Sequence, residues 1–340
     1  MQERTDVHLV SWGLWLPERT ADGARLARDF GVPVDVMQEK IGIRLKHVPG
    51  PDDGCAAMAS RAARIALERA GLAAADLDAV VYCGSEYKEH IVWNAAARIQ
   101  QLIGATGALS FEVYALCAGL PIALRVARDM MAGDARLRHL LVVTASREGD
   151  LVDPRNPRTR WMANFGAGAG AIVLSRDGGP GTLAGFAGFT DARLAMSVVQ
   201  PAGGTARPAS RETVEGREHR LDVTDMDAMR TILEEISLPA YLGVVDEALE
   251  ISGRARGDVT LLGLTHMKTS FHRALVEALG IEARRAIYLD GIGHIQSVDQ
   301  VAALEVGRES GLLDRPGVVV LAAAGTGYTW SAMAIEWKGE

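Results

Sequence analysis

The two halves of this 340-residue sequence repeat one order of elements, and that repetition limits the possible folds more than any other feature. Residues 66–85 read as a helix, an acidic turn and a strand, and residues 248–267 repeat that order. The next segments also correspond, because residues 117–146 and residues 294–324 each read as a helix, a polar turn and a strand. Strands rich in Val and Leu that alternate with Ala-rich helices are typical of an α/β protein with buried strands.

Each half then closes on a glycine-spaced turn and an apolar strand, "FGAGAGAIVL" in the first half and "AGTGYTWSAMAIEW" in the second. We infer an internal duplication with a junction near residues 175–185. The predicted halves are residues 1–178, with a candidate nucleophile, and residues 179–340, with two candidate histidines. Cys117 and His294 lie the same number of residues before equivalent points in the strands that follow them. We therefore expect these two residues to begin equivalent helices.

Composition and charge exclude several classes of protein. A net charge of −7 and a pI near 5.7 give no general attraction to nucleic acid or to an anionic membrane. No apolar stretch approaches the roughly 18 residues of a membrane span. Three cysteines without metal-ligand spacing argue against a disulfide framework and against a metal site. We therefore expect a cytoplasmic protein, and we predict that the polar, aperiodic residues 200–221 form a surface loop.

Cys117 stands where an apolar run meets Ala-Gly and then a long helical pattern. The unpaired N–H groups and partial positive charge of a helix N-terminus favour the thiolate, which is the reactive form of cysteine. The bland alternative is that Cys117 is a small apolar residue at a junction between a strand and a helix. Cys55 and Cys83 lack this setting, and we interpret both as structural or incidental.

Five motifs carry a family resemblance, which covers about residues 7–338 in order. They are "LCAGLPIAL", "FGAGAGAIVL", "THMKTSFHRAL", "GIGHIQSVDQ" and "GTGYTW". Together they resemble the thiolase superfamily and, within it, condensing enzymes of the ketoacyl-ACP synthase III type. The resemblance implies a five-layered αβαβα fold, with one helix from each half packed back to back between two sheets. It also implies a homodimer and no permanently bound cofactor, with acyl-CoA or acyl-ACP as substrates.

The resemblance also assigns catalytic positions. Cys117 is the nucleophile position, His266 and His294 are the catalytic polar positions, and the backbone N–H of Gly327 completes an oxyanion hole with that of Cys117. Type III synthases normally carry asparagine where this chain has His294, whereas a Cys-His-His set resembles the elongating condensing enzymes. Either side chain can donate a hydrogen bond to the thioester oxygen of a malonyl unit. We therefore expect His294 to serve decarboxylation more than acylation of Cys117.

The sequence gives weaker signals for the residues that bind the substrate's pantetheine carrier and for those at the dimer interface. A pantetheine carrier brings phosphate and, in a carrier protein, acidic groups, so a basic rim is expected. The segment 84–96 aligns with the family's loop that crosses to the partner subunit. Within it, Ile91 aligns near the residue that usually caps the acyl pocket. We also expect the strand near 107–114 to lie at the dimer interface. Each basic residue alone is more often a solvated surface charge. The candidate binding residues are Lys40, Arg158, Arg160, Lys268 and Thr269.

Three functions stay open at this point. The first is an enzyme that forms an acyl thioester on Cys117 and condenses it with a malonyl thioester, with loss of carbon dioxide, in fatty acid or polyketide-like metabolism. The second is an acyltransferase on the same scaffold that passes the acyl group to a hydroxyl or an amine. The third is a non-catalytic partner subunit, against which the presence of Cys117, His266 and His294 argues.

Overall fold

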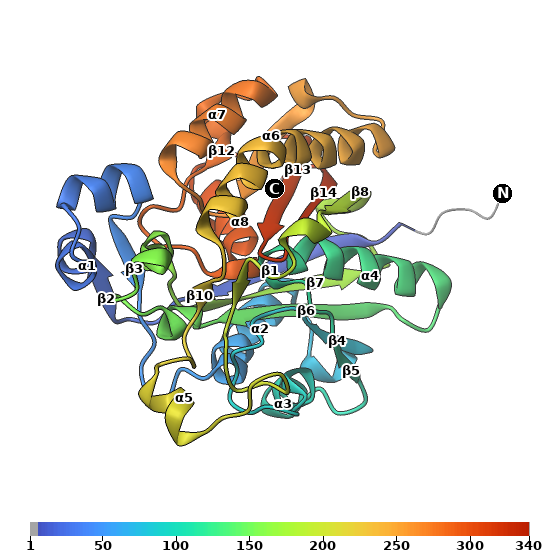
Figure 1. Ribbon diagram of the computed structural model, residues 1–340. Helices are drawn as coiled ribbons and strands as arrows, with labels where there is room; N and C mark the ends of the chain where they lie inside the picture. Colours follow the sequence, from blue (N-terminus) through green and yellow to red (C-terminus); the bar gives the residue numbers. More distant parts are fainter. Residues whose placement is uncertain (1–5, 340) are drawn as a thin grey trace.

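The computed structural model describes residues 6–339 and has one continuous sheet built from two similar five-stranded parts (Figure 1). The strand order is β12-β11-β13-β14-β8-β1-β7-β6-β4-β5. Read outward from the centre, the two parts are β1-β7-β6-β4-β5 and β8-β14-β13-β11-β12, which is the same order in each half. The two parts meet where β1 pairs with β8 over His8–Thr182 and Leu9–Gly181.

The strands of the first part are β1 (His8–Trp15), β4 (Ala79–Tyr82), β5 (Leu109–Glu112), β6 (His139–Ser146) and β7 (Gly168–Ser175). Those of the second are β8 (Gly181–Thr190), β11 (Val259–Leu264), β12 (Ala286–Ile287), β13 (Gly317–Gly325) and β14 (Thr329–Trp337). Two small ribbons pair β2 (Thr20–Asp22) with β3 (Leu45–His47) and β9 (Val198–Val199) with β10 (Asp222–Val223). The predicted boundary after residue 178 falls between β7 and β8, and we propose it as the division between the halves.

The helices are α1 (Gly23–Phe30), α2 (Cys55–Ala70), α3 (Ala95–Ile103), α4 (Gly119–Gly133), α5 (Arg211–Glu215), α6 (Met226–Ile251), α7 (Thr269–Leu279) and α8 (Asp299–Glu309). Figure 1 shows α6 and α7 on one side of the molecule and α2 and α3 on the opposite side. Helices α4 and α8 pack between the two parts of the sheet, where their apolar side chains share one core with both.

Three hydrophobic cores separate these layers, and neighbouring residues of one strand face different cores. In β4, Val80 packs in the core under α2 and α3, whereas Val81 packs in the central core. In β13, Val319 faces the central core and Val320 faces the core under α6 and α7. Because successive side chains of a strand point to opposite faces, a strand covered on both faces is apolar throughout. The predicted α/β fold with five αβαβα layers is confirmed.

A tight turn precedes each central helix. Leu116–Ala118 form a 3₁₀ turn before α4, and Gln296–Val298 form the matching turn before α8. Their first residues have φ values of 52° and 51°, which non-glycine residues rarely adopt. The residue equivalent to Cys117 is therefore Ser297, so the predicted pairing of Cys117 with His294 at equivalent helix starts is wrong. His294 lies in the loop before the second turn.

The predicted surface loop at 200–221 is mostly exposed, and it contains the short helix α5. No helix within the described residues is long and apolar enough to cross a membrane.

Candidate active site

The Cys117 thiol contacts a histidine from the other half of the chain. Its Sγ atom lies 3.2 Å from His294 Nε2, although the two residues are 177 positions apart. Cys117 is buried, and its 3₁₀ turn joins directly onto α4 at Gly119. A Cβ atom at Gly119 would come within 2.8 Å of the Cys83 carbonyl oxygen, so only glycine allows this close approach. The geometry presents the thiol to an imidazole that can exchange a proton with it.

Asp299 holds the other side of the His294 ring. The Nδ1 atom of His294 donates to Asp299 Oδ2 over 2.6 Å, and the backbone N–H groups of His266 and Ile295 donate to the same carboxylate over 2.7 Å each. Asp299 is fully buried at the first residue of α8, where the helix N-terminus favours a negative charge. Cys117, His294 and Asp299 therefore form one hydrogen-bonded chain, which fixes the tautomer and orientation of the imidazole.

Sequence reasoning missed Asp299. The available signal was an acidic residue in the first turn of a helix, five residues after His294 and within the quoted motif "GIGHIQSVDQ". An acidic residue at a helix start is commonly only a capping residue, so this signal does not by itself identify a partner for a histidine.

The two histidines have opposite protonation preferences. Burial opposes the charged form of His294, but the nearby Asp299 and Cys117 outweigh it and hold the pKa of His294 well above its ordinary value. Burial lowers the pKa of His266 to about 4, so this ring is neutral at neutral pH. Neither ring nitrogen of His266 makes a hydrogen bond of good geometry to any described residue. One ring thus carries a proton to exchange, and the other is neutral and can donate from one ring N–H.

His266 is oriented by packing. It follows the end of β11 by two residues, and its ring lies 4.8 Å from that of Tyr288. The Tyr288 hydroxyl is in turn bonded to Thr269 Oγ1 over 2.9 Å and donates to the Met267 carbonyl over 3.0 Å. Thr269, predicted to reach the pantetheine arm, therefore also orients the aromatic ring behind His266.

Lys46 is a second residue that the sequence did not single out. Its ammonium group is buried and donates to the carbonyl oxygens of Ala163 and Phe165 over 2.9 and 2.8 Å. Burial lowers the pKa of Lys46 to about 8. The Phe165 ring packs edge-on against His294 with centroids 4.9 Å apart, so Lys46 anchors the segment that covers His294.

The other two cysteines are unsuited to nucleophilic attack. Both are buried and neither forms a disulfide. Burial raises the pKa of Cys55 to about 12 and raises that of Cys83 further, so both stay protonated at neutral pH. Both residues pack in apolar cores, in keeping with the structural interpretation.

Gly327 stands in the turn between β13 and β14, and its φ of 112° is open only to glycine. Two residues earlier, a Cβ atom at Gly325 would lie 3.0 Å from the Cys117 backbone nitrogen. The glycine turn therefore passes directly beside the nucleophile. The role of the Gly327 N–H in an oxyanion hole stays a prediction.

The predicted basic rim is exposed. Arg158 forms an ion pair with Asp222, and this pairing leaves its guanidinium less available to a ligand. Within residues 6–339, the other three cations form no ion pair. They are exposed and lie before β3, in the 3₁₀ segment Pro157–Asn164 and at the N-cap of α7: Lys40, Arg160 and Lys268. The structure does not bring these residues into contact with Cys117, and their roles in binding stay predictions.

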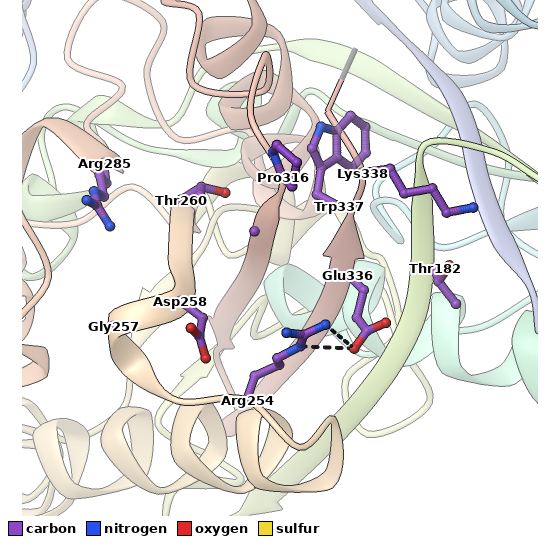
Figure 2. A pocket seen from close by; sticks show the side chains of 11 residues that line it. Thr182, Arg254, Gly257, Asp258, Thr260, Arg285, Pro316, Glu336, Trp337 and Lys338 are labelled. Atoms are coloured by element: carbon purple, nitrogen blue, oxygen red, sulfur yellow. Dashed lines mark hydrogen bonds and ion pairs between the residues drawn. The ribbon is translucent and has the colours of Figure 1, made fainter.

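A groove of about 630 Å³ lies elsewhere on the molecule (Figure 2). Its lining includes Asp258 and Gly317, at the starts of β11 and β13, whereas His266 follows the opposite end of β11. Arg254 and Glu336 pair across its wall at 3.0 Å. The groove is therefore separate from the cluster around Cys117, and two of its charged residues, Arg254 and Glu336, already pair with each other.

Known proteins resemble the chain over nearly its whole length. Residues 111–192 match the family model of 3-oxoacyl-[acyl-carrier-protein (ACP)] synthase III, and residues 249–337 match its C-terminal model. A beta-ketoacyl-[acyl-carrier-protein] synthase III of Roseiflexus sp. (strain RS-1) is 28% identical over 97% of this chain and 98% of its own length.

Solved structures agree in fold. The 3-oxoacyl-(acyl carrier protein) synthase III of Pseudomonas aeruginosa PAO1 has a TM-score of 0.83 at 24% identity, covering 98% of each chain. The priming beta-ketosynthase of the R1128 polyketide pathway has a TM-score of 0.84 at 24% identity, covering 100% of this chain and 98% of its own. The chain therefore belongs to the ketoacyl synthase III-like enzymes of the thiolase superfamily.

Proposed function

We propose that the protein is an acyltransferase that forms an acyl thioester on Cys117 and condenses it with a malonyl thioester, releasing carbon dioxide. The observation that carries this proposal is the 3.2 Å contact between Cys117 Sγ and His294 Nε2 at the head of α4, with His266 tied to the same Asp299 carboxylate. The curated relatives named as synthase III support the condensation.

In the first step the thiol proton resides on His294, and the Cys117 thiolate attacks the carbonyl carbon of the acyl donor. The bond from that carbon to the donor sulfur breaks, and the departing thiolate takes the proton from His294. The contact with Cys117 gives His294 a part in acylation as well as in decarboxylation. The backbone N–H groups of Cys117 and Gly327 stabilise the oxyanion in this proposal.

In the second step the malonyl carboxylate leaves as carbon dioxide, and its electron pair forms an enolate on the remaining thioester. Before this step His294 Nε2 takes up a proton from water, and the N–H groups of His266 and His294 then stabilise the enolate oxygen. The enolate carbon then attacks the acyl carbonyl, the bond to Cys117 Sγ breaks, and the thiolate is restored. A neutral His266 suits this step because it donates one hydrogen bond without needing to gain a proton.

The test is intact-mass measurement after incubation with a panel of acyl-CoAs, followed by labelled malonyl-CoA. Wild type is expected to gain an adduct on Cys117 and then release labelled carbon dioxide, and Cys117→Ala should do neither. An adduct that maps to Cys55 or Cys83 would contradict the assignment. Release of no carbon dioxide from malonyl-CoA or a malonyl carrier protein, with an acylated enzyme, would exclude condensation.

The relatives favour condensation, but the same site geometry is also compatible with the second candidate, transfer of the acyl group to a hydroxyl or amine. The chain from Cys117 through His294 to Asp299 has the arrangement that activates hydroxyl nucleophiles in acyl-transfer enzymes. Once the acyl-enzyme has formed, the charge on Cys117 no longer helps to hold a proton on His294. Its Nε2 atom can then accept the proton of an acceptor hydroxyl as that oxygen attacks the thioester.

His294→Asn separates the two reactions. Asparagine keeps a hydrogen-bond donor but cannot accept a proton at neutral pH. If condensation is the reaction, this variant should retain much of the carbon dioxide release after acylation. If acyl transfer is the reaction, wild type should release none, an alcohol or amine should clear the adduct, and His294→Asn should clear it on the order of 100-fold more slowly.

The rest of the proposal concerns the carrier of the acyl group, the cell compartment and the pathway. We propose that CoA phosphate or an acidic carrier protein meets Lys40, Arg160 and Lys268, which are exposed. Lys268→Ala and Arg160→Ala should raise KM for the acyl donor with little effect on kcat. Three unbridged cysteines fit the reducing cytoplasm. Fatty acid or polyketide-like synthesis is the proposed pathway.

A further inference from the structure

A buried amide that the mechanism does not use lies beside the nucleophile. Gln296 is 1% exposed and begins the turn before α8, two residues after His294. The next residue, Ser297, donates from Oγ to the Leu116 carbonyl over 2.8 Å, and Leu116 adjoins Cys117. Neither the nitrogen nor the oxygen of the Gln296 amide has a hydrogen-bond partner of good geometry in residues 6–339.

A buried carboxyl group lies next to this amide. Glu148 is 9% exposed, and Ser85 Oγ donates to its Oε1 atom over 2.8 Å. Burial raises the pKa of Glu148, while hydrogen bonds from Ser85 and Gln296 and the charge of His294 act in the opposite direction, so the carboxyl is close to Gln296 and to His294. A protonated carboxyl can donate as well as accept a hydrogen bond.

Backbone packing also places the Glu148 segment beside Phe165, the residue that packs on His294. A Cβ atom at the neighbouring Gly149 would lie 2.5 Å from the Phe165 carbonyl oxygen, so the two segments touch. The Phe165 ring packs on His294, which contacts Cys117 Sγ. Glu148 and Gln296 thus reach the same space around His294 from the two halves of the chain.

The hydrogen-bonding capacity at this depth is only partly used, because the Gln296 oxygen has no partner within residues 6–339. Leaving a buried polar group unsatisfied costs about 1–3 kcal/mol, and an alkyl chain packed against these groups would do nothing to satisfy them. A site with buried polar groups favours a ligand that pairs with them and rejects its apolar analogue strongly.

We propose that Glu148 and Gln296 form a polar wall of the acyl site and select an acyl group that carries a hydrogen-bonding substituent over a plain alkyl chain. The proposal rests on the proposed acylation of Cys117. The substituent is a hydroxyl or carboxyl group within a few atoms of the thioester, because the wall flanks His294, which contacts the nucleophile itself.

The test compares rates of adduct formation on Cys117 from butyryl-CoA, 3-hydroxybutyryl-CoA and succinyl-CoA, followed by intact mass. Wild type is expected to react with at least one polar donor about 10-fold or more faster than with butyryl-CoA. Comparison of the rates with 3-hydroxybutyryl-CoA and with succinyl-CoA shows whether the wall accepts a hydroxyl or a carboxyl group. A wild-type rate with butyryl-CoA that equals or exceeds both others overturns the proposal.

Variants then assign the preference to the wall. Gln296→Leu should bring the ratio of polar to apolar rates to about 1, and Leu116 shows that leucine adopts the same positive φ at the equivalent position. Glu148→Leu should lower this ratio in the same way, whereas Glu148→Gln should keep the preference for the hydroxyl donor. The exposed control Gln101→Leu should leave the ratio unchanged.

The outcomes distinguish a failure of the polar-wall proposal from a failure of the proposed function. If both leucine variants slow all three donors equally, the residues are only structural and the polar wall is wrong, while acylation of Cys117 stands. If no thioester acylates Cys117 in the wild-type protein, the proposed function itself fails.

Discussion

Asp299 accepts three hydrogen bonds, and their donors are the His294 ring and the backbones of His266 and Ile295. One carboxylate therefore fixes the imidazole beside the thiol and the start of the segment that carries the second histidine. A buried carboxylate without such donors would be left with unsatisfied acceptor atoms, and here three donors satisfy it. At the residue scale, the site depends on this one side chain.

Asp299→Asn should lower the rate of Cys117 acylation about 10²–10⁴-fold, because the amide no longer stabilises the imidazolium or selects its tautomer. Removing the negative charge also lowers the pKa of His294, which Asp299 helps to raise. The His294 proton is then lost at a lower pH. The alkaline limb of the pH profile for acylation should therefore move to lower pH.

The measurement is the acylation rate by rapid quench and mass, across pH, for wild type, Asp299→Asn and the surface control Asp290→Asn. Asp290 pairs with Arg44 and is partly exposed. An unchanged pH profile in a folded but slow Asp299→Asn protein would show that Asp299 acts only through structure.

The two 3₁₀ turns before α4 and α8 act as one unit at the scale of elements. Ser297 Oγ donates to the Leu116 carbonyl over 2.8 Å, and Ser331 Oγ donates to the Ala118 carbonyl over 3.0 Å. Both serine side chains are fully buried, and their bonds hold the backbone on either side of Cys117. They also connect the second half of the chain to the nucleophile of the first, so the two central helices set the position of the thiol together.

Ser297→Ala and Ser331→Ala should each reduce the free energy of unfolding by about 0.5–1.5 kcal/mol, because each leaves one buried carbonyl without its donor. Both should also slow acylation, since the turn loses part of its restraint. Urea unfolding and the acylation rate are the measurements, with the exposed Ser270→Ala as the control. Full stability in both variants would show that these bonds do not hold the turn.

At the scale of the whole molecule, the edge strand β5 and the neighbouring loop form an exposed apolar surface. Ile91 is 84% exposed, Val92 is 101% exposed and Leu109 in β5 is 55% exposed. Val92 is β-branched and has a φ of 52°, a conformation that its side chain rarely adopts. An unpaired strand edge beside exposed apolar side chains favours association with a second copy. We propose a two-fold dimer through this surface.

Light scattering at micromolar concentration should give the mass of a dimer. Ile91→Asp and Val92→Asp should each shift the equilibrium toward monomer, because a charge at an apolar interface is costly to bury. Val34→Asp is the matched control, since Val34 is 44% exposed on a different surface segment. A monomeric wild-type protein, or equal effects of all three variants, would contradict the interface.

Local patterns in the sequence determined the fold and much of the site. Strand and helix periodicity are properties of neighbouring residues, so the α/β order, the repeat and the buried strands followed from them. Cys117 could be singled out because a thiol at the start of a helix has a physical reason for its position. The family motifs then supplied His266, His294 and Gly327, whose roles remain predictions.

Contacts between distant segments were decided only by the tertiary structure. Cys117 and His294 are 177 residues apart, and no local pattern shows that their side chains meet. Counting back from the strands paired Cys117 with His294 because it assumed equal connections, but α4 has 15 residues and α8 has 11. Asp299 had no local signal beyond an acidic residue at a helix start, and only the fold places it against the imidazole. Which polar groups share a buried space depends on how the layers pack, and that information is not contained in any one segment.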